Sequence, residues 1–393
     1  FSGCTALKEV NFEEGITSIP GSIFADTGLE RVDVPDTVTN IGEHAFAYCE
    51  KLSYLHLSNS LKRIGNYAFR NTIALTEINV PKTLTDIDTY GWNWQYPFSG
   101  SGITKIKWAE GITQVPYALF GGCIKLEQIN MPDTITEVKE RSFAGCEKLA
   151  EVNIPDTVTS IGASAFSGCK SIQNIKLPGK LTFIGNYAFR NCTALTRVTI
   201  PKTLTTVDTY GLNYQCPFDN CTSLEQIIFE EGIPALPDCL FENAIGSDKG
   251  VSIVIPEGVT WIGGRCFKNF TNLKTIILPT TLERIYDYSF SGTGIENITI
   301  PDGIKAMYKS VFYQCKNLEE ITIPNSIEEL GTYIFSDCTS LTKVILNNTR
   351  QNITTGMFQN CTSLEEITLP DSVTNINAYA FAGCTSLKTI KWS

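Results

Sequence analysis

Apolar residues along this chain recur in a unit of 22 or 23 positions, and a column of phenylalanines shows the period most clearly. Two intervals of 29 residues and one of 26 are the exceptions. The column consists of Phe1, Phe24, Phe46, Phe69, Phe98, Phe120, Phe143, Phe166, Phe189, Phe218, Phe241, Phe267, Phe290, Phe312, Phe335, Phe358 and Phe381. A fixed period of this size is typical of a solenoid, in which each repeat stacks on the next.

Each repeat has the same internal order of apolar and polar positions, as residues 358–381 show. A strand over residues 364–369 comes first, because apolar and polar side chains alternate there. A proline closes this strand in 11 of 17 turns, since it has no N–H to continue a ladder. A second short extended piece follows at residues 373–376. The repeat therefore predicts two extended segments per turn.

A corner is expected next, formed by a brief helical turn around the repeat phenylalanine, such as Phe381. Two residues after this phenylalanine stands Gly, Asn or Asp in 15 of 17 turns. These residues tolerate a positive φ, so we expect a left-handed residue that caps the helical turn.

A single turn cannot be stable by itself, because ordering 23 residues costs roughly 20–40 kcal/mol of backbone entropy. Stacked turns share ladder hydrogen bonds and cover each other's apolar layers. We therefore expect one α/β solenoid over residues 1–393, with about 17 turns. It should be a right-handed superhelix with a parallel β-sheet on the concave face and short helical turns and extended segments outside.

Three segments depart from the regular repeat. Two expanded loops occur at residues 82–97 and 202–217, and a looser turn occurs at 244–252. Between residues 64–98 and 184–218, 24 of 35 positions are identical, which indicates the duplication of a block of repeats. Both ends of the sequence fall inside a repeat, so we expect a fragment that is truncated at both ends.

The segment "CEKLAEVNIPDTVTSIGASAFSGC" at residues 146–169 follows the pattern C-x-x-L-x-x-I-x-[IL]-P-x-x-[VL]-T-x-I-G-x-x-A-F-x-x-C. This pattern resembles the BspA-type leucine-rich repeat, and the resemblance covers essentially the whole chain. Proteins of that family occur on the surfaces of host-associated bacteria and some protist parasites, and they are linked with adhesion to host proteins. The resemblance implies a secreted or surface-attached binding protein without catalytic residues.

Composition narrows the possible partners. The formal charge is −10 and the pI is about 4.9, so the chain lacks the positive charge that nucleic-acid binding requires. No apolar run approaches the roughly 18 residues of a membrane span. We expect no nucleic acid, no membrane span in this fragment, no cofactor and a monomer.

Fourteen cysteines raise the question of disulfides, and eleven of them stand three residues after the repeat phenylalanine. These are Cys4, Cys49, Cys123, Cys146, Cys169, Cys192, Cys221, Cys315, Cys338, Cys361 and Cys384. Other turns hold threonine or phenylalanine at this position, which a bridging position would not accept. We therefore expect small buried thiols. Cys216 and Cys239 share another column in adjacent turns and are the one pair that merits a test for a disulfide. The sequence has no C-x-x-C motif and predicts no metal site.

One candidate binding surface is an apolar stripe of Ile228, Val254 and Ile277. In most turns the second outward position of the strand is polar, whereas these three consecutive turns carry aliphatic residues there. Exposed apolar clusters mark contact sites. The alternative is that β-branched residues merely suit strands.

The expanded loops provide the other candidates, Trp92, Trp94 and Tyr96 in the first loop and Tyr210 and Tyr214 in the second. Their rings either pack down over the gap that each insertion opens or project as contact residues. Tryptophan and tyrosine dominate binding hot spots, which favours them as ligand-binding candidates.

Three functions are compatible with this sequence. The first is a non-enzymatic binding or adhesion module, secreted or at the cell surface, that recognises a host or extracellular protein or a glycan. The second is a structural stalk that presents other domains of a longer surface protein. The third is an enzyme, which the sequence disfavours because no base, orienting partner and nucleophile recur with catalytic spacing around His44 or His56.

Overall fold

Two sets of parallel strands run through the turns of the chain, one of longer strands and one of two-residue strands. The structure is a computed structural model, and it describes residues 1–13, 15–87, 96–208, 216–346 and 352–392. The chain divides into two compact units, Phe1–Leu195 (unit 1) and Thr196–Ser393 (unit 2).

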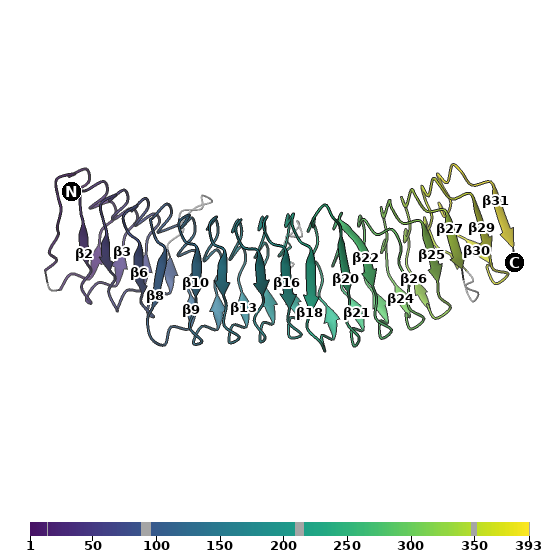
Figure 1. Ribbon diagram of the computed structural model, residues 1–393, viewed down its shortest axis with the longest axis horizontal. Coiled ribbons are helices and arrows are strands. Elements are labelled where there is room, and N and C mark those ends of the chain that lie inside the picture. Colours follow the sequence, from purple (N-terminus) through teal and green to yellow (C-terminus); the bar gives the residue numbers. More distant parts are fainter. Residues whose placement is uncertain (14, 88–95, 209–215, 347–351, 393) are drawn as a thin grey trace. The chain divides into compact units, whose positions relative to one another are not determined.

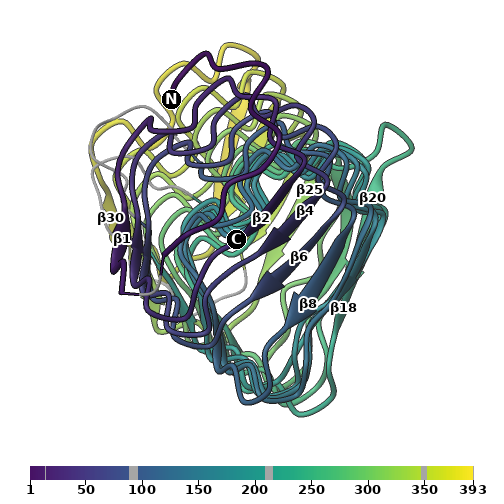
Figure 2. The same cartoon turned by 90° about the vertical axis from the view of Figure 1, so that its left-hand side faces the viewer.

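In unit 1, successive turns place equivalent strands side by side (Figures 1 and 2). The longer strands are β2 (Arg31–Asp33), β4 (Tyr54–His56), β6 (Glu77–Val80), β8 (Lys105–Trp108), β10 (Gln128–Asn130), β12 (Glu151–Asn153) and β14 (Asn174–Lys176). The short strands are β1 (Ser18–Ile19), β3 (Asn40–Ile41), β5 (Arg63–Ile64), β7 (Asp86–Ile87), β9 (Gln114–Val115), β11 (Glu137–Val138), β13 (Ser160–Ile161) and β15 (Phe183–Ile184). Figure 2 shows β2, β4, β6 and β8 on one side of the stack and β1 on the other.

Pairing in unit 1 is parallel throughout, and it links each turn to the next. The short strands form the ladders β1-β3-β5-β7 and β9-β11-β13-β15. The longer strands pair as β2-β4, β6-β8 and β10-β12. Residues 22 or 23 apart therefore lie directly opposite one another, as Ile129 does to Val152, except in β6-β8, where the partners Ile78 and Ile106 are 28 apart.

Unit 2 repeats the arrangement. Its longer strands are β16 (Arg197–Ile200), β18 (Gln226–Phe229), β20 (Val251–Val254), β22 (Leu273–Ile277), β25 (Glu320–Ile323), β27 (Lys343–Leu346), β29 (Glu366–Leu369) and β31 (Thr389–Trp392). Its short strands are β17 (Thr206–Val207), β19 (Ala235–Leu236), β21 (Trp261–Ile262), β23 (Arg284–Ile285), β24 (Ala306–Met307), β26 (Glu329–Leu330), β28 (Asn352–Ile353) and β30 (Asn375–Ile376). The pairs β16-β18, β20-β22, β25-β27 and β29-β31 are parallel, as is the ladder β19-β21-β23-β24-β26.

The repeat phenylalanines form the centre of the core in both units. The rings of Phe143 and Phe166 stack with centroids 5.4 Å apart and planes 11° apart, and both are fully buried. In unit 2, Phe267 and Phe290 stack at 5.6 Å and 3°. Offset stacking adds to the apolar burial of the rings. The phenylalanine column of the sequence is thus a continuous ladder of rings within each unit.

The corners contain no helix among the described residues, so the expected helical turns are wrong, and the described residues form a β-solenoid and not the expected α/β solenoid. The residues two before and two after Phe166, Ser164 and Gly168, have φ of 54° and 75°. Two left-handed residues four positions apart interrupt the run of negative φ that an α-helix needs. The backbone N–H of Phe166 donates instead to the carbonyl of Ala188 in the next turn, at 2.7 Å. The expected left-handed residue after the phenylalanine is confirmed, but it belongs to a turn.

The buried position of the corner cysteines is confirmed for nine of the eleven, whereas Cys4 is exposed and Cys384 is half-buried. The thiol of Cys169 donates to the carbonyl of Phe143 in the preceding turn, at 3.3 Å. Where threonine replaces the cysteine, its hydroxyl donates to the phenylalanine carbonyl of its own turn, as Thr27 does to Phe24 at 2.9 Å. The column therefore accepts cysteine and threonine because both supply a small hydrogen-bond donor. Burial raises the pKa of the Cys192 thiol to about 12, so this thiol stays protonated and unreactive.

Candidate functional site

The predicted apolar stripe lies on the outward face of three successive longer strands of unit 2. Ile228 belongs to β18, Val254 to β20 and Ile277 to β22. Val254 lies directly opposite Ile277 in the parallel register. Their exposed fractions are 61% and 56%, whereas Ile228 is half-buried. Val254 and Ile277, together with the partly exposed Ile228, thus form an aliphatic surface, called the stripe below.

The inward neighbours of the stripe show that the predicted strand register is correct. Ile227, Ile253 and Ile276 each precede a stripe residue and are buried in the core. Because side chains alternate between the two faces of a strand, the stripe residues must point outward. This outcome confirms the outward position of the three residues and the exposure of Val254 and Ile277, and it leaves the ligand of the stripe a prediction.

An irregularity in the pairing of β20 with β22 begins just before the stripe. The register shifts between Val251 and Ser252, so that Val251 pairs with Leu273 and Ser252 with Thr275. One extra residue, Lys274, is accommodated on β22, and its side chain covers Gly250, which has φ +89°. Such bulges redirect strands and are frequent next to functional surfaces. The register shift therefore lies at the end of the looser turn 244–252, just before Val254.

Polar groups border the stripe. Lys249 and Glu225 form an ion pair at 3.1 Å, and so do Lys274 and Glu296. Thr199, which lies opposite Ile228 in the register, continues the row as a polar residue. An apolar centre with a polar border is the usual anatomy of a protein contact surface. The stripe carries no titratable atom, so it can bind a ligand but cannot catalyse a reaction.

The equivalent face of unit 1 is polar. An open groove of about 850 Å³ lies over β8, β10 and β12, and its lining includes Lys105, Gln128, Asn130, Lys148 and Glu151. The indole Nε1 of Trp108 donates to the carbonyl of Asn130 at 2.8 Å, so this aromatic side chain is bonded to the backbone of the next turn. This face is a less suitable apolar anchor than the stripe.

Of the aromatic loop residues, only Tyr96 lies within the described part of the chain; Trp92, Trp94, Tyr210 and Tyr214 lie outside it. The Tyr96 ring packs on Gly121 of the next turn, where an added Cβ would come within 2.3 Å of the ring. Burial raises the pKa of the Tyr96 hydroxyl to about 12. Tyr96 therefore packs down over the next turn. This agrees with the alternative in which the loop rings cover the gap of the insertion, and not with the alternative in which they project as contact residues.

Sequence reasoning missed an aromatic cluster beside the short strands of unit 2. The rings of Trp261 and Tyr286 are perpendicular at 5.9 Å, and Tyr286 stacks on Tyr308 at 4.9 Å. With Asp238 and Asp287, Trp261 and Tyr286 line a shallow pocket of about 360 Å³. The sequence does contain a sign of this cluster. Tyr286 and Tyr308 stand directly after the second extended piece of their turns, where the pattern of the repeat has glycine.

Comparisons with known proteins agree with this geometry. The family model for the BspA type leucine rich repeat region matches residues 1–96, 94–217, 214–319 and 305–393. Among solved structures, a leucine-rich repeat protein from Bacteroides ovatus is 34% identical, with a TM-score of 0.61, and the match covers 79% of this chain and 73% of that one. No curated protein matches the chain.

Two further solved structures are more distant. A leucine rich cell surface protein from Faecalibacterium prausnitzii is 25% identical, with a TM-score of 0.39 and coverage of 98% of this chain and 86% of that one. A leucine-rich repeat protein from Eubacterium ventriosum is 23% identical, with a TM-score of 0.42 and coverage of 74% and 73%. In the described residues, no helix is both long enough and apolar enough to cross a membrane. The family match over the whole length, together with the identity to the Bacteroides ovatus protein, shows that the chain belongs to the BspA-type leucine-rich repeat family.

Proposed function

We propose that this chain is a non-enzymatic binding module, secreted or held at a cell surface, that recognises an extracellular protein of a host. Membership of the BspA-type family supports a repeat scaffold whose surface residues, and not its core, carry the function. The observation that carries the proposal is the stripe, where three adjacent turns expose aliphatic side chains on a strand face that is otherwise mainly polar.

The stripe is large enough to anchor a modest contact. Covering Ile228, Val254 and Ile277 contributes on the order of 4–8 kcal/mol before the costs of association. Those costs absorb much of this amount, which leaves an affinity on the order of micromolar when the polar border adds few contacts. A protein partner suits the stripe better than a glycan, because an aliphatic surface gives sugars few hydrogen bonds.

Binding to a panel of purified host extracellular-matrix and plasma proteins tests the proposal. The double variant Ile228→Glu with Ile277→Lys places opposite charges on the stripe. We expect it to lose binding to any panel protein that the wild-type chain captures, while its melting temperature stays nearly unchanged, because both side chains face outward.

A matched control carries the same charges elsewhere on the same face. Thr322→Glu with Thr368→Lys alters the equivalent outward positions of β25 and β29, away from the stripe. This control should bind like the wild type. Normal binding by the stripe variant would contradict the assignment of the stripe. Capture on a glycan array, with no panel protein bound, would indicate a glycan ligand instead. A chain that binds neither class would favour the structural stalk.

A further inference from the structure

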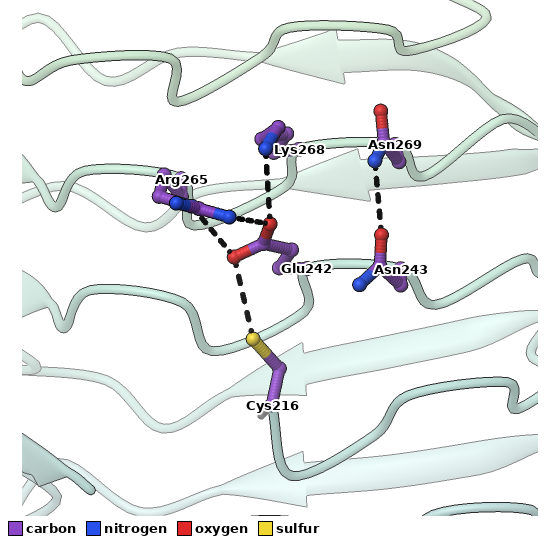
Figure 3. Close-up of polar contacts among 6 residues, drawn as sticks. All are labelled: Cys216, Glu242, Asn243, Arg265, Lys268 and Asn269. Atoms are coloured by element: carbon purple, nitrogen blue, oxygen red, sulfur yellow. Dashed lines mark hydrogen bonds and ion pairs between the residues drawn. The ribbon is translucent and has the colours of Figure 1, made fainter. Parts of the chain in front are cut away.

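A buried carboxylate in unit 2 is held between two cations and a thiol (Figure 3). Glu242 is 1% exposed. Its Oε2 accepts from Nε of Arg265 at 2.9 Å and from Sγ of Cys216 at 3.4 Å. Its Oε1 pairs with the Arg265 guanidinium and with Nζ of Lys268 at 3.3 Å. Three successive turns of the stack therefore meet at one buried side chain.

A second thiol belongs to the same cluster. Cys239 lies three residues before Glu242, in the turn after Cys216, and is buried like Cys216. The two Sγ atoms and a carboxylate oxygen of Glu242 lie within 4.8 Å of one another. Cys216 differs from the corner thiols, which donate to phenylalanine carbonyls, because its acceptor is a carboxylate. Two sulfur atoms and one oxygen thus converge on a single buried point.

The charges of this cluster do not cancel while the thiols are protonated. Arg265 alone would neutralise Glu242, and Lys268 adds a second positive charge, which gives a net charge of +1. Loss of both thiol protons would change this to −1, and a divalent cation would restore +1. A divalent ion can therefore replace two protons without altering the buried charge, which removes the main electrostatic cost of binding it here.

We propose that Cys216, Cys239 and Glu242 bind one divalent metal ion of the zinc class. Two sulfur ligands select borderline-soft ions such as Zn²⁺ over Mg²⁺ or Ca²⁺. Typical bond lengths of about 2.3 Å to sulfur and 2.0 Å to oxygen put the two ligand atoms of a tetrahedral site about 3.5 Å apart. The Cys216 Sγ and the Glu242 Oε2 are 3.4 Å apart, so the ion takes the place of the thiol proton between them.

The rest of the cluster suits a metal site. Binding exchanges two thiol protons for one ion, and the fourth coordination position accepts water. Arg265 and Lys268 keep their contacts with Glu242 and orient it, as partners of ligating carboxylates commonly do. The three ligands come from two adjacent turns. Cys239 and Glu242 follow Cys216 by 23 and 26 residues, so the site has no C-x-x-C motif by which the sequence would reveal it. This inference does not depend on the stripe.

The test uses the full chain, freed of metal by a chelator and kept reduced. Cd²⁺, a spectroscopic substitute for Zn²⁺, gives an ultraviolet charge-transfer band when thiolates bind it. We expect this band to saturate at about one Cd²⁺ per chain and to be reversed by Zn²⁺. Elemental analysis after gel filtration should find about one zinc per chain.

Single serine variants locate the ion. Cys216→Ser and Cys239→Ser should each weaken Zn²⁺ binding at least about tenfold, since each removes one of two thiolate ligands. Cys338→Ser is the matched control, because Cys338 is also buried in unit 2 but donates to the carbonyl of Phe312. It should bind Zn²⁺ like the wild type. Melting curves should show that all three variants fold.

Several results would overturn the proposal. The absence of a saturating band, or equal binding by the wild type and both ligand variants, would show that the cluster does not hold the ion. Peptide mapping of the chain before reduction provides a further check. A Cys216–Cys239 disulfide in most molecules would assign the pair to a covalent cross-link and rule out the metal site.

Discussion

Val254 and Ile277 lie directly opposite each other in the parallel pair β20-β22, and both side chains are more than half exposed. The residues immediately before them, Ile253 and Ile276, are buried. Two adjacent isoleucines on β22 therefore face opposite environments, one in the core and one at the surface of the stripe.

This alternation predicts that the same substitution has a large effect on stability at one position and a small effect at its neighbour. Ile276→Ala should lower the free energy of unfolding by about 2–4 kcal/mol, because it removes buried methyl groups and leaves a cavity. Ile277→Ala should change it by less than about 0.5 kcal/mol. Urea denaturation followed by circular dichroism measures both. A large loss with Ile277→Ala and a small one with Ile276→Ala would mean that the register is shifted by one residue.

The left-handed corner residue gives a second prediction. Gly168 has φ +75°, and an added Cβ would have room, with the nearest atom 3.6 Å away. Gly168→Ala should therefore cost about 1–2 kcal/mol through backbone conformation alone. Gly179→Ala is the control, because Gly179 is not left-handed and an added Cβ meets only Asp156 at 3.4 Å. Equal unfolding free energies for the two variants would argue against the left-handed corner.

The corner thiols act as hydrogen-bond donors, which a pair of variants of the same shape can test. Cys169→Thr introduces a hydroxyl that we expect to donate to the carbonyl of Phe166, as Thr27 does to Phe24. Cys169→Val supplies no donor. The valine variant should be less stable than the threonine variant by about 0.5–1.5 kcal/mol in urea denaturation. Equal stability would show that the column requires only a small side chain.

The redox state of these cysteines is open to direct measurement. Because burial raises the pKa of thiols such as Cys123, to about 12, the corner cysteines should resist oxidation. Thiol counting after denaturation without reductant should find at least about ten reactive thiols. Five or more disulfides in the purified chain would contradict the packing role of this column.

Because the Tyr96 hydroxyl is buried, we expect the free energy of unfolding to fall at alkaline pH. Its pKa is raised by burial to about 12 in the folded chain, from 10 in the unfolded chain, so the folded chain holds the phenolic proton more tightly. The stabilisation is present below pH 10 and is lost as the pH rises from 10 towards 12. The unfolding free energy of the wild type should therefore fall more steeply over this range than that of Tyr96→Phe. Parallel curves would indicate that the Tyr96 ring is exposed.

The sequence by itself determined the features that depend on the period. Phenylalanines 22 or 23 residues apart must stack once equivalent strands pair, so the ring ladder, the parallel strands and the outward position of Val254 and Ile277 could all be predicted. The left-handed residue after the phenylalanine was also predictable, because its identity reports a local backbone conformation.

Only the tertiary structure decided the features that depend on contacts between turns. The corner around Phe166 is a turn and not a helix, because its backbone N–H finds the carbonyl of Ala188 in the next turn. The cluster of Cys216, Cys239 and Glu242 could not be predicted from the sequence, for a related reason. The period states which residues lie in neighbouring turns, but the direction of their side chains depends on hydrogen bonds that form only after the turns have stacked.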